Sequence, residues 1–184
     1  MESMSVQKQV AIVGHSLVPR NLRSVPGAEI RIFRAPGAKV ASFESNRTLN
    51  AVLQWPHGLT ILFIGGNDIY DGCIPSSIAT NIQNVIEQIH EYCKSDIAFV
   101  LIENRDPPLG NRFNVSATQY NRVANNINNR LKRKYKTKPY IKFLSVGAKP
   151  FQRGVTDGIH FDSETRFHLE RKLRNTIARY INDN

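Results

Sequence analysis

The chain has 184 residues, two cysteines and a formal net charge of +10, from 25 Lys and Arg against 15 Asp and Glu. This length suits one globular domain over residues 1–184 that buries roughly two-thirds of its extended-chain surface. The cysteines have no CxxC or Cys/His spacing, which favours neither a disulfide framework nor a structural zinc site. With no run of ~20 apolar residues and no signal-peptide pattern, we expect an intracellular protein without a membrane span.

Five segments of strand length follow one another along the chain. Four are almost continuously apolar: Val10 to Val13, Leu59 to Ile64, Ile97 to Ile102 and Ile141 to Val146. Such continuity is typical of parallel strands that are covered on both faces of a sheet. Glu29 to Phe33 instead alternates between polar and apolar residues, which predicts an edge strand.

Helical patterns lie between these strands and after the last of them. Apolar residues recur at helical spacing over Val40 to Trp55, 78–89, 120–131 and 169–180. The alternation of strands and helices predicts right-handed crossovers and an α/β fold with three layers, α/β/α. Its five-stranded parallel sheet has the flavodoxin-like order 2-1-3-4-5 in the simplest arrangement.

Candidate site residues occupy turns that follow the predicted strands. These turns are Gly14-His15-Ser16, Pro36-Gly37, residues 65–68 and, after the fifth strand, Asp157 to His160. Ligands of such sheets bind beyond the carboxyl ends of the strands. We therefore expect four turns that are distant in sequence to meet at one rim.

Three residues of these turns could form a nucleophile with its proton acceptor. A serine hydroxyl becomes nucleophilic when an imidazole removes its proton and a carboxylate holds that imidazole in the right tautomer. Ser16, His160 and Asp157 are predicted to fill these roles, and the chemistry needs no cofactor. The structural alternative is a turn serine or helix cap at Ser16, a helix cap at Asp157 and a surface histidine at His160.

The same hypothesis requires donors for the oxyanion of the tetrahedral intermediate. We predict that these donors are the backbone N–H groups of Ser16 and Gly37 and the side-chain amide of Asn67. Asp68 is interpreted as a brace for the turn rather than as an acid. Loss of one oxyanion donor typically removes about 3–4 kcal/mol of transition-state stabilisation.

Four blocks of the sequence, taken in order, resemble the SGNH, or GDSL-type, hydrolases. The blocks are Val10 to Val18, Arg34 to Ala38, Phe63 to Asp68 and Asp157 to Phe161. The resemblance implies that Ser16 is the nucleophile, that Gly37 and Asn67 are oxyanion donors, and that Asp157 and His160 are the acid and base. It also implies hydrolysis of small acyl esters, commonly acetyl esters, without a metal ion.

One residue departs from the family pattern. Where the family usually has Gly-Asp-Ser, this chain has Gly14-His15-Ser16, so the role of the aspartate is absent or replaced. His15 could be a turn residue, a substrate contact or a metal ligand. The third block and the basic C-terminal region also resemble SGNH domains found in some retrotransposon and viral proteins.

The positive charge is concentrated late in the chain. Residues 1–111 have 9 Lys and Arg against 10 Asp and Glu, whereas residues 112–184 have 16 against 5. The densest basic stretch is predicted to contact nucleic acid or to be a solvated helix end whose cations complement the helix dipole. Its residues are Arg130, Lys132, Arg133, Lys134, Lys136 and Lys138. The alternative function is accordingly an SGNH-fold module, catalytically weak or inactive, that binds nucleic acid or another anionic polymer.

Overall fold

The structure is a computed structural model that describes residues 7–15, 17–20, 22–44, 47–105, 115–146, 161 and 163–183. Within these residues the chain forms a five-stranded sheet in which every adjacent pair is parallel, with the order β2-β1-β3-β4-β5. The strands are β1 (Lys8–Gly14), β2 (Ala28–Arg34), β3 (Leu59–Phe63), β4 (Asp96–Val100) and β5 (Ile141–Leu144). The predicted α/β fold class and strand order are confirmed.

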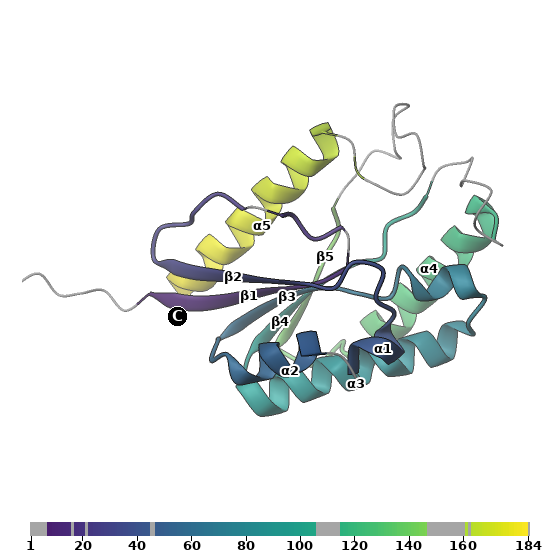
Figure 1. The fold of residues 1–184 in the computed structure, drawn as a ribbon, viewed down its shortest axis with the longest axis horizontal. Coiled ribbons are helices and arrows are strands. Elements are labelled where there is room, and N and C mark those ends of the chain that lie inside the picture. Colours follow the sequence, from purple (N-terminus) through teal and green to yellow (C-terminus); the bar gives the residue numbers. More distant parts are fainter. Residues whose placement is uncertain are drawn as a thin grey trace, which may run out of the picture.

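Helices cover both faces of this sheet. They are α1 (Val40–Glu44), α2 (Arg47–Gln54), the 3-10 helix η1 (Asp68–Asp71), α3 (Pro75–Cys93), α4 (Ala117–Lys134) and α5 (Ser163–Asp183). Figure 1 shows α5 on one side of the sheet and α1 to α4 on the other. The single helix predicted from Val40 to Trp55 is described as two, α1 and α2.

Two hydrophobic cores lie on the two faces of the sheet. Successive residues of a strand point to opposite faces, so Ala11 and Val13 pack with α2, α3 and α4, whereas Val10 and Ile12 pack with α5. All four side chains are fully buried. Burial on both faces explains why the central strands read as continuous apolar runs.

Local sequence signals set where two of the helices begin. Pro75 is the first residue of α3, a position where its missing N–H costs no intrahelical bond. Ser116 forms a capping box at the start of α4: its hydroxyl accepts from the N–H of Gln119 (3.1 Å), and the Gln119 amide oxygen accepts from the N–H of Ser116 (3.2 Å).

The parallel arrangement places the turns that follow the strands at one edge of the sheet, on the right in Figure 1. The C-terminal end of α4 leads into β5 and therefore lies toward the opposite edge. None of the helices in the described ranges is both long and apolar enough to cross a bilayer.

Candidate active site

The predicted site residues divide into two groups. Ser16, Asp157 and His160 lie outside the described residues, so their roles as nucleophile, acid and base stay predictions. Gly37 and Asn67, the predicted oxyanion donors, are described. The described part of the candidate site consists of these two residues and the segments that surround them.

Gly14 is the point where the first three strands are joined at the carboxyl edge. Its carbonyl oxygen accepts from the N–H of Ala35 (2.8 Å), while the next residue, His15, donates its N–H to the carbonyl oxygen of Phe63 (3.1 Å). A Cβ on Gly14 would overlap that carbonyl oxygen and lie 2.7 Å from the Phe63 Cβ. Glycine is thus required here because the backbones approach too closely for a side chain.

Gly37 lies in the turn after β2 for a different reason. Its φ of +75° is in the left-handed region that favours glycine, yet a Cβ would meet nothing within 4 Å. Gly37 is also exposed to solvent. The open space beside its backbone is what an approaching substrate oxygen would need.

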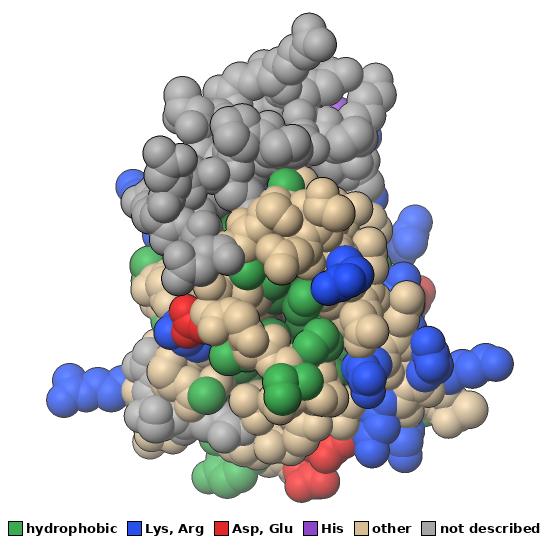
Figure 2. Space-filling model, turned by 90° about the vertical axis from the view of Figure 1, so that its right-hand side faces the viewer, with side chains coloured by type: hydrophobic (Ala, Val, Ile, Leu, Met, Phe, Trp, Pro, Cys, Tyr) green, Lys and Arg blue, Asp and Glu red, His purple; other side chains and the backbone are tan. Residues whose placement is uncertain are grey.

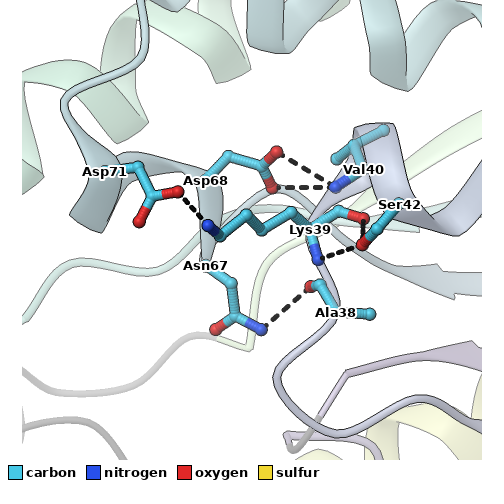
Figure 3. Close-up of polar contacts among 7 residues, drawn as sticks. All are labelled: Ala38, Lys39, Val40, Ser42, Asn67, Asp68 and Asp71. Atoms are coloured by element: carbon cyan, nitrogen blue, oxygen red, sulfur yellow. Dashed lines mark hydrogen bonds and ion pairs between the residues drawn. The ribbon is translucent and has the colours of Figure 1, made fainter.

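Asn67 connects the third loop to this turn. Its Nδ2 donates to the carbonyl oxygen of Ala38 (3.0 Å), the residue that follows Gly37 (Figure 3). A primary amide has two N–H donors, and this bond uses one of them. The structure therefore brings two of the predicted donor residues together and orients the Asn67 amide toward the Gly37 turn.

Asp68 also connects the loop after β3 with the segment that follows the Gly37 turn (Figure 3). Only 4% of the residue is exposed, and its two carboxylate oxygens accept from the N–H of Val40, the first residue of α1, at 3.0 and 3.1 Å. Burial is the main cause that raises the pKa of Asp68 to about 6. Nearby, Lys39 forms an ion pair with Asp71. The interpretation of Asp68 as a structural brace agrees with these contacts.

His15 is buried within the turn after β1, with 6% of the residue exposed. Its carbonyl oxygen accepts from the N–H of Val18 (3.2 Å), and its Nδ1 accepts a long hydrogen bond from the N–H of Leu17 (3.4 Å). A carboxylate at residue 15 could accept from the same N–H, two residues further on, as in an Asx turn. Of the three interpretations of His15, these contacts support the turn residue.

Tyr120 and Arg105 lie beside Gly66, together with His15. A Cβ on Gly66 would lie 3.1 Å from Tyr120 Oη, 3.5 Å from His15 Nε2 and 3.9 Å from Arg105 Nη2. The Arg105 guanidinium carbon lies 5.4 Å from the centre of the Tyr120 ring, a cation–π contact. Burial raises the pKa of the Tyr120 phenol, so it stays neutral.

Arg105 is a residue that the sequence reasoning missed. It is 3% exposed, and its backbone is held by Asn121, which accepts from the Arg105 N–H (2.6 Å) and donates to the Arg105 carbonyl oxygen (2.9 Å). A buried guanidinium beneath a glycine turn is a source of positive potential close to the predicted oxyanion donors. Its place just after the apolar segment Ile97 to Ile102 is the signal that could have found it.

A cleft of about 540 Å³ opens beside the turn after β1. Its walls come from residues that follow β1, from the end of β2 and its turn, and from the start of α5. Leu17 and Phe161, which directly follow Ser16 and His160 in the sequence, both line it. The described lining residues are Leu17, Val18, Pro19, Arg20, Arg34, Pro36, Phe161, Arg166, Leu169 and Glu170.

Figure 2 looks onto the edge of the molecule where the strands end. Apolar side chains lie in the middle of the described surface, with Lys and Arg side chains on both sides and more of them on one side. Among the described residues, no three His, Cys, Asp or Glu side chains are grouped so that they could hold a metal ion.

A second buried polar cluster lies at the amino edge of the sheet. The His57 Nδ1 is 2.6 Å from the carbonyl oxygen of Trp55, and its Nε2 is 2.8 Å from Thr60 Oγ1. Thr60 Oγ1 is in turn 2.9 Å from Ser95 Oγ. Burial lowers the pKa of His57, which favours the neutral imidazole. We assign this cluster a structural role.

The residues predicted to contact nucleic acid are all exposed and lie toward the amino edge, away from the cleft. They occupy the C-terminal part of α4 and the turn that follows: Arg130, Lys132, Arg133, Lys134, Lys136 and Lys138. Arg130 Nε donates to Asn126 Oδ1 (2.7 Å) within the helix. Nucleic-acid binding by this stretch stays a prediction.

Comparison with known proteins identifies the family. The model of the GDSL-like Lipase/Acylhydrolase family matches residues 9–165, which is most of the chain. No curated protein sequence has a significant match to this chain.

Several solved structures have the same fold. A carbohydrate acetylesterase from Sinorhizobium meliloti has a TM-score of 0.69 at 17% identity, with 94% of this chain and 99% of that chain covered. The aryl esterase of M. smegmatis has a TM-score of 0.67 at 18% identity, with 92% and 98% covered. A member of the lipolytic G-D-S-L family from Veillonella parvula has a TM-score of 0.70 at 15% identity, with 94% and 99% covered. At these identities the likeness establishes the fold.

Proposed function

Because the chain belongs to the GDSL-like lipase and acylhydrolase family, we propose that it is a serine esterase that hydrolyses small acyl esters of the acetyl type. In this proposal Ser16 is the nucleophile, His160 the general base and Asp157 the carboxylate that orients the imidazole. The residues of the family blocks and the geometry of the carboxyl edge support these roles.

The proposed reaction has two halves. His160 takes the proton of the Ser16 hydroxyl as its oxygen attacks the ester carbonyl, and then gives that proton to the leaving alcohol when the tetrahedral intermediate collapses to an acyl-enzyme. In the second half, His160 activates water, which releases the acid and restores Ser16. The N–H groups of Ser16 and Gly37 and the second amide N–H of Asn67 stabilise the oxyanion in both halves.

The observation that carries the proposal is the bond between the Asn67 amide and the Ala38 carbonyl oxygen (3.0 Å). It draws the third loop against the Gly37 turn, so that donors from two loops can point at one substrate oxygen. The lining of the cleft adds support, because Leu17 and Phe161 border it together. The buried Arg105 would further favour negative charge at this edge.

The structural neighbours suggest the size of the acyl group. One is a carbohydrate acetylesterase and another an aryl esterase. An acetylesterase removes acetyl groups, and an aryl ester can carry an acetyl group, so we extend acetyl-ester hydrolysis to this chain as part of the proposal. A retrotransposon or viral origin remains a prediction from the sequence.

The test is hydrolysis of p-nitrophenyl acetate by the wild type, by Ser16→Ala and by Ser77→Ala, an exposed serine of α3 that serves as the matched control. We expect kcat/KM to fall by roughly 10³-fold or more in Ser16→Ala, because the nucleophile is lost, and to stay unchanged in Ser77→Ala. A fluorophosphonate should label the wild type and Ser77→Ala once, and Ser16→Ala not at all.

Equal rates in the wild type and Ser16→Ala would reject the assignment of Ser16. If the wild type turns over no member of a broad panel of acyl esters, the alternative function is favoured, a binding module for an anionic polymer. Nucleic-acid binding that weakens steeply as salt is raised would then be expected from the basic stretch Arg130 to Lys138.

A further inference from the structure

The cleft beside the turn after β1 contains a charge pattern that ester hydrolysis itself does not require. Arg20 comes from the segment after β1, Arg34 is the last residue of β2, and Arg166 lies in the first turn of α5. Glu170 is the one acidic residue among the described lining residues. Arginines therefore outnumber acidic residues three to one in the described lining of the cleft.

The type of cation is informative. A guanidinium is a planar fork with five N–H donors that matches the oxygens of a carboxylate or phosphate in a bidentate manner. Arg166 donates its Nε–H to the carbonyl oxygen of Phe161 (2.9 Å), which orients the side chain and uses one of its five N–H donors. Arg20 is exposed at the rim, where it can reach an incoming anion.

The rest of the cleft is apolar. Val18 and Leu169 are each 2% exposed and Phe161 is 4% exposed, so these three belong to the core that underlies the cleft. A volume of about 540 Å³ is within the range of small-molecule sites, roughly 300–1,000 Å³. The ligand that matches this lining is a small molecule with an apolar body and an anionic end.

We propose that the natural substrate is a small ester that carries a carboxylate or a phosphate, and that Arg20 and Arg166 bind this anion in the cleft. The proposal rests on the proposed function, since Leu17 follows the predicted nucleophile and Phe161 follows the predicted base. An anion held by these arginines would leave the ester carbonyl at the turn that contains Ser16. The arginines are thus specificity determinants for the reaction and not part of its proton transfer.

The experiment compares three acetate esters of similar size. They are 4-acetoxybenzoate, 4-acetoxyphenyl phosphate and the neutral 4-acetoxybenzamide, so the acyl group is constant and the charge varies. We expect kcat/KM for at least one anionic ester to exceed that for the amide by about tenfold or more, since a hydrogen bond between two charged groups is stronger than one to a neutral amide. The better of the two anions identifies the carboxylate or the phosphate as the preferred group.

Variants then locate the preference. Arg166→Gln and Arg20→Gln should each reduce the ratio of anionic to neutral kcat/KM by about tenfold, mainly through the KM of the anionic ester. Arg179→Gln removes an exposed cation near the other end of the same helix and should leave the ratio as in the wild type. A preference for the anionic esters that persists in both cleft variants would overturn the proposal. Equal kcat/KM of the wild type for all three esters would also overturn it.

Binding separates failure of this inference from failure of the proposed function. In Ser16→Ala, 4-hydroxybenzoate or 4-hydroxyphenyl phosphate should bind more tightly than 4-hydroxybenzamide by calorimetry, and Arg166→Gln in that background should abolish the difference. If no ester is turned over but this difference is found, the esterase proposal fails and the anion site stands. If esters are hydrolysed without any charge preference in rate or binding, the anion site fails and the esterase proposal stands.

Discussion

At the amino edge of the sheet, His57, Thr60 and Ser95 are buried and bonded to one another, whereas at the carboxyl edge His15, Asp68 and Arg105 are buried around glycine turns. Both edges have an adjacent hollow, since a depression of about 500 Å³ lies beside His57 as well. A buried polar cluster near a cavity is therefore not sufficient to identify a functional site in this molecule.

The difference lies in where the hydrogen bonds go. At the amino edge both ring nitrogens of His57 have partners within the cluster or its backbone, so the polar atoms are occupied with one another. At the carboxyl edge Asp68 accepts from the N–H of Val40 and His15 accepts from the N–H of Leu17, and the bond to Ala38 uses one of the two N–H donors of Asn67. We expect substitutions of Asn67 and His15 at the carboxyl edge to lower catalysis, and substitution of Thr60 at the amino edge to lower stability alone.

The largest effect is expected for Asn67→Ala. Removal of an oxyanion donor lowers kcat by about 10²–10³-fold, or about 3–4 kcal/mol of transition-state stabilisation. The lost bond to Ala38 should reduce the free energy of unfolding by only about 1 kcal/mol. Ester hydrolysis and urea denaturation measure the two quantities. A kcat within threefold of the wild type would exclude Asn67 as a donor.

Gly14→Ala tests the junction of the first three strands. A Cβ there would overlap the Phe63 carbonyl oxygen, and relief of the clash should lower the free energy of unfolding by about 3 kcal/mol. Gly37→Ala is the matched control, because its Cβ has open space and only the positive φ opposes it, at about 1 kcal/mol. Similar losses in urea denaturation for the two variants would contradict the close packing inferred at Gly14.

The pH dependence of stability should reveal the burial of Asp68. Its folded pKa of about 6 lies above the ordinary value, so between about pH 4 and 6 the folded state binds more protons than the unfolded state. The free energy of unfolding should therefore fall as pH rises through this range, by up to about 3 kcal/mol, and Asp68→Asn should abolish that component. Urea denaturation from pH 4 to 7.5 measures how the free energy of unfolding changes with pH in the wild type and in Asp68→Asn.

His57 should give a slope of the opposite sign, because burial lowers its folded pKa. Its contribution to stability is complete above the pKa of the unfolded histidine and is lost as pH falls below it.

The Asp68 prediction is contradicted if the free energy of unfolding depends on pH in Asp68→Asn as it does in the wild type. That result would show that the Asp68 carboxylate is better solvated than the geometry indicates.

Thr60→Val breaks the amino-edge cluster with little change in shape. It leaves His57 Nε2 and Ser95 Oγ without the hydroxyl that bonds them, which should reduce the free energy of unfolding by about 2 kcal/mol. We expect kcat/KM for p-nitrophenyl acetate to be unchanged at a temperature where the variant is folded. A loss of kcat/KM in fully folded Thr60→Val would contradict the assignment of a structural role to the amino-edge cluster.

The smallest effect is expected at His15. His15→Asn retains a side-chain acceptor for the Leu17 N–H and should keep kcat/KM within about threefold of the wild type, whereas His15→Leu removes the acceptor and should lower it by about tenfold. The contrast between the two variants isolates the hydrogen bond from the loss of the ring. Equal activities would mean that this 3.4 Å bond does not hold the turn.

The strands were the most predictable feature of the chain. The apolar run Val10 to Val13 lies inside β1, and the alternating segment Glu29 to Phe33 lies inside the edge strand β2. Each pattern follows from which faces of the sheet are covered, which is a property of a few consecutive residues. The proximity of the Gly37 turn and Asn67 was also predictable, because both follow strands and the strand ends share a rim, whereas their role as oxyanion donors stays a prediction.

Contacts between distant segments could not be predicted in the same way. The Asn67 bond to Ala38 joins residues 29 positions apart, and Arg105 becomes part of the site only because its loop folds under Gly66. Nothing in the sequence relates Arg20 to Arg166. Their common cleft exists because β1 and α5 are neighbours in the fold.

Hydrophobic period and turn chemistry are local properties, so the α/β class, the positions of the strands and the candidate residues at their ends could be inferred from the chain alone. Only the folded molecule shows which of those ends lie together, which polar groups are buried and where arginines from both ends of the chain line one cleft. Those outcomes depend on packing between elements and on side-chain direction, which short-range patterns do not encode.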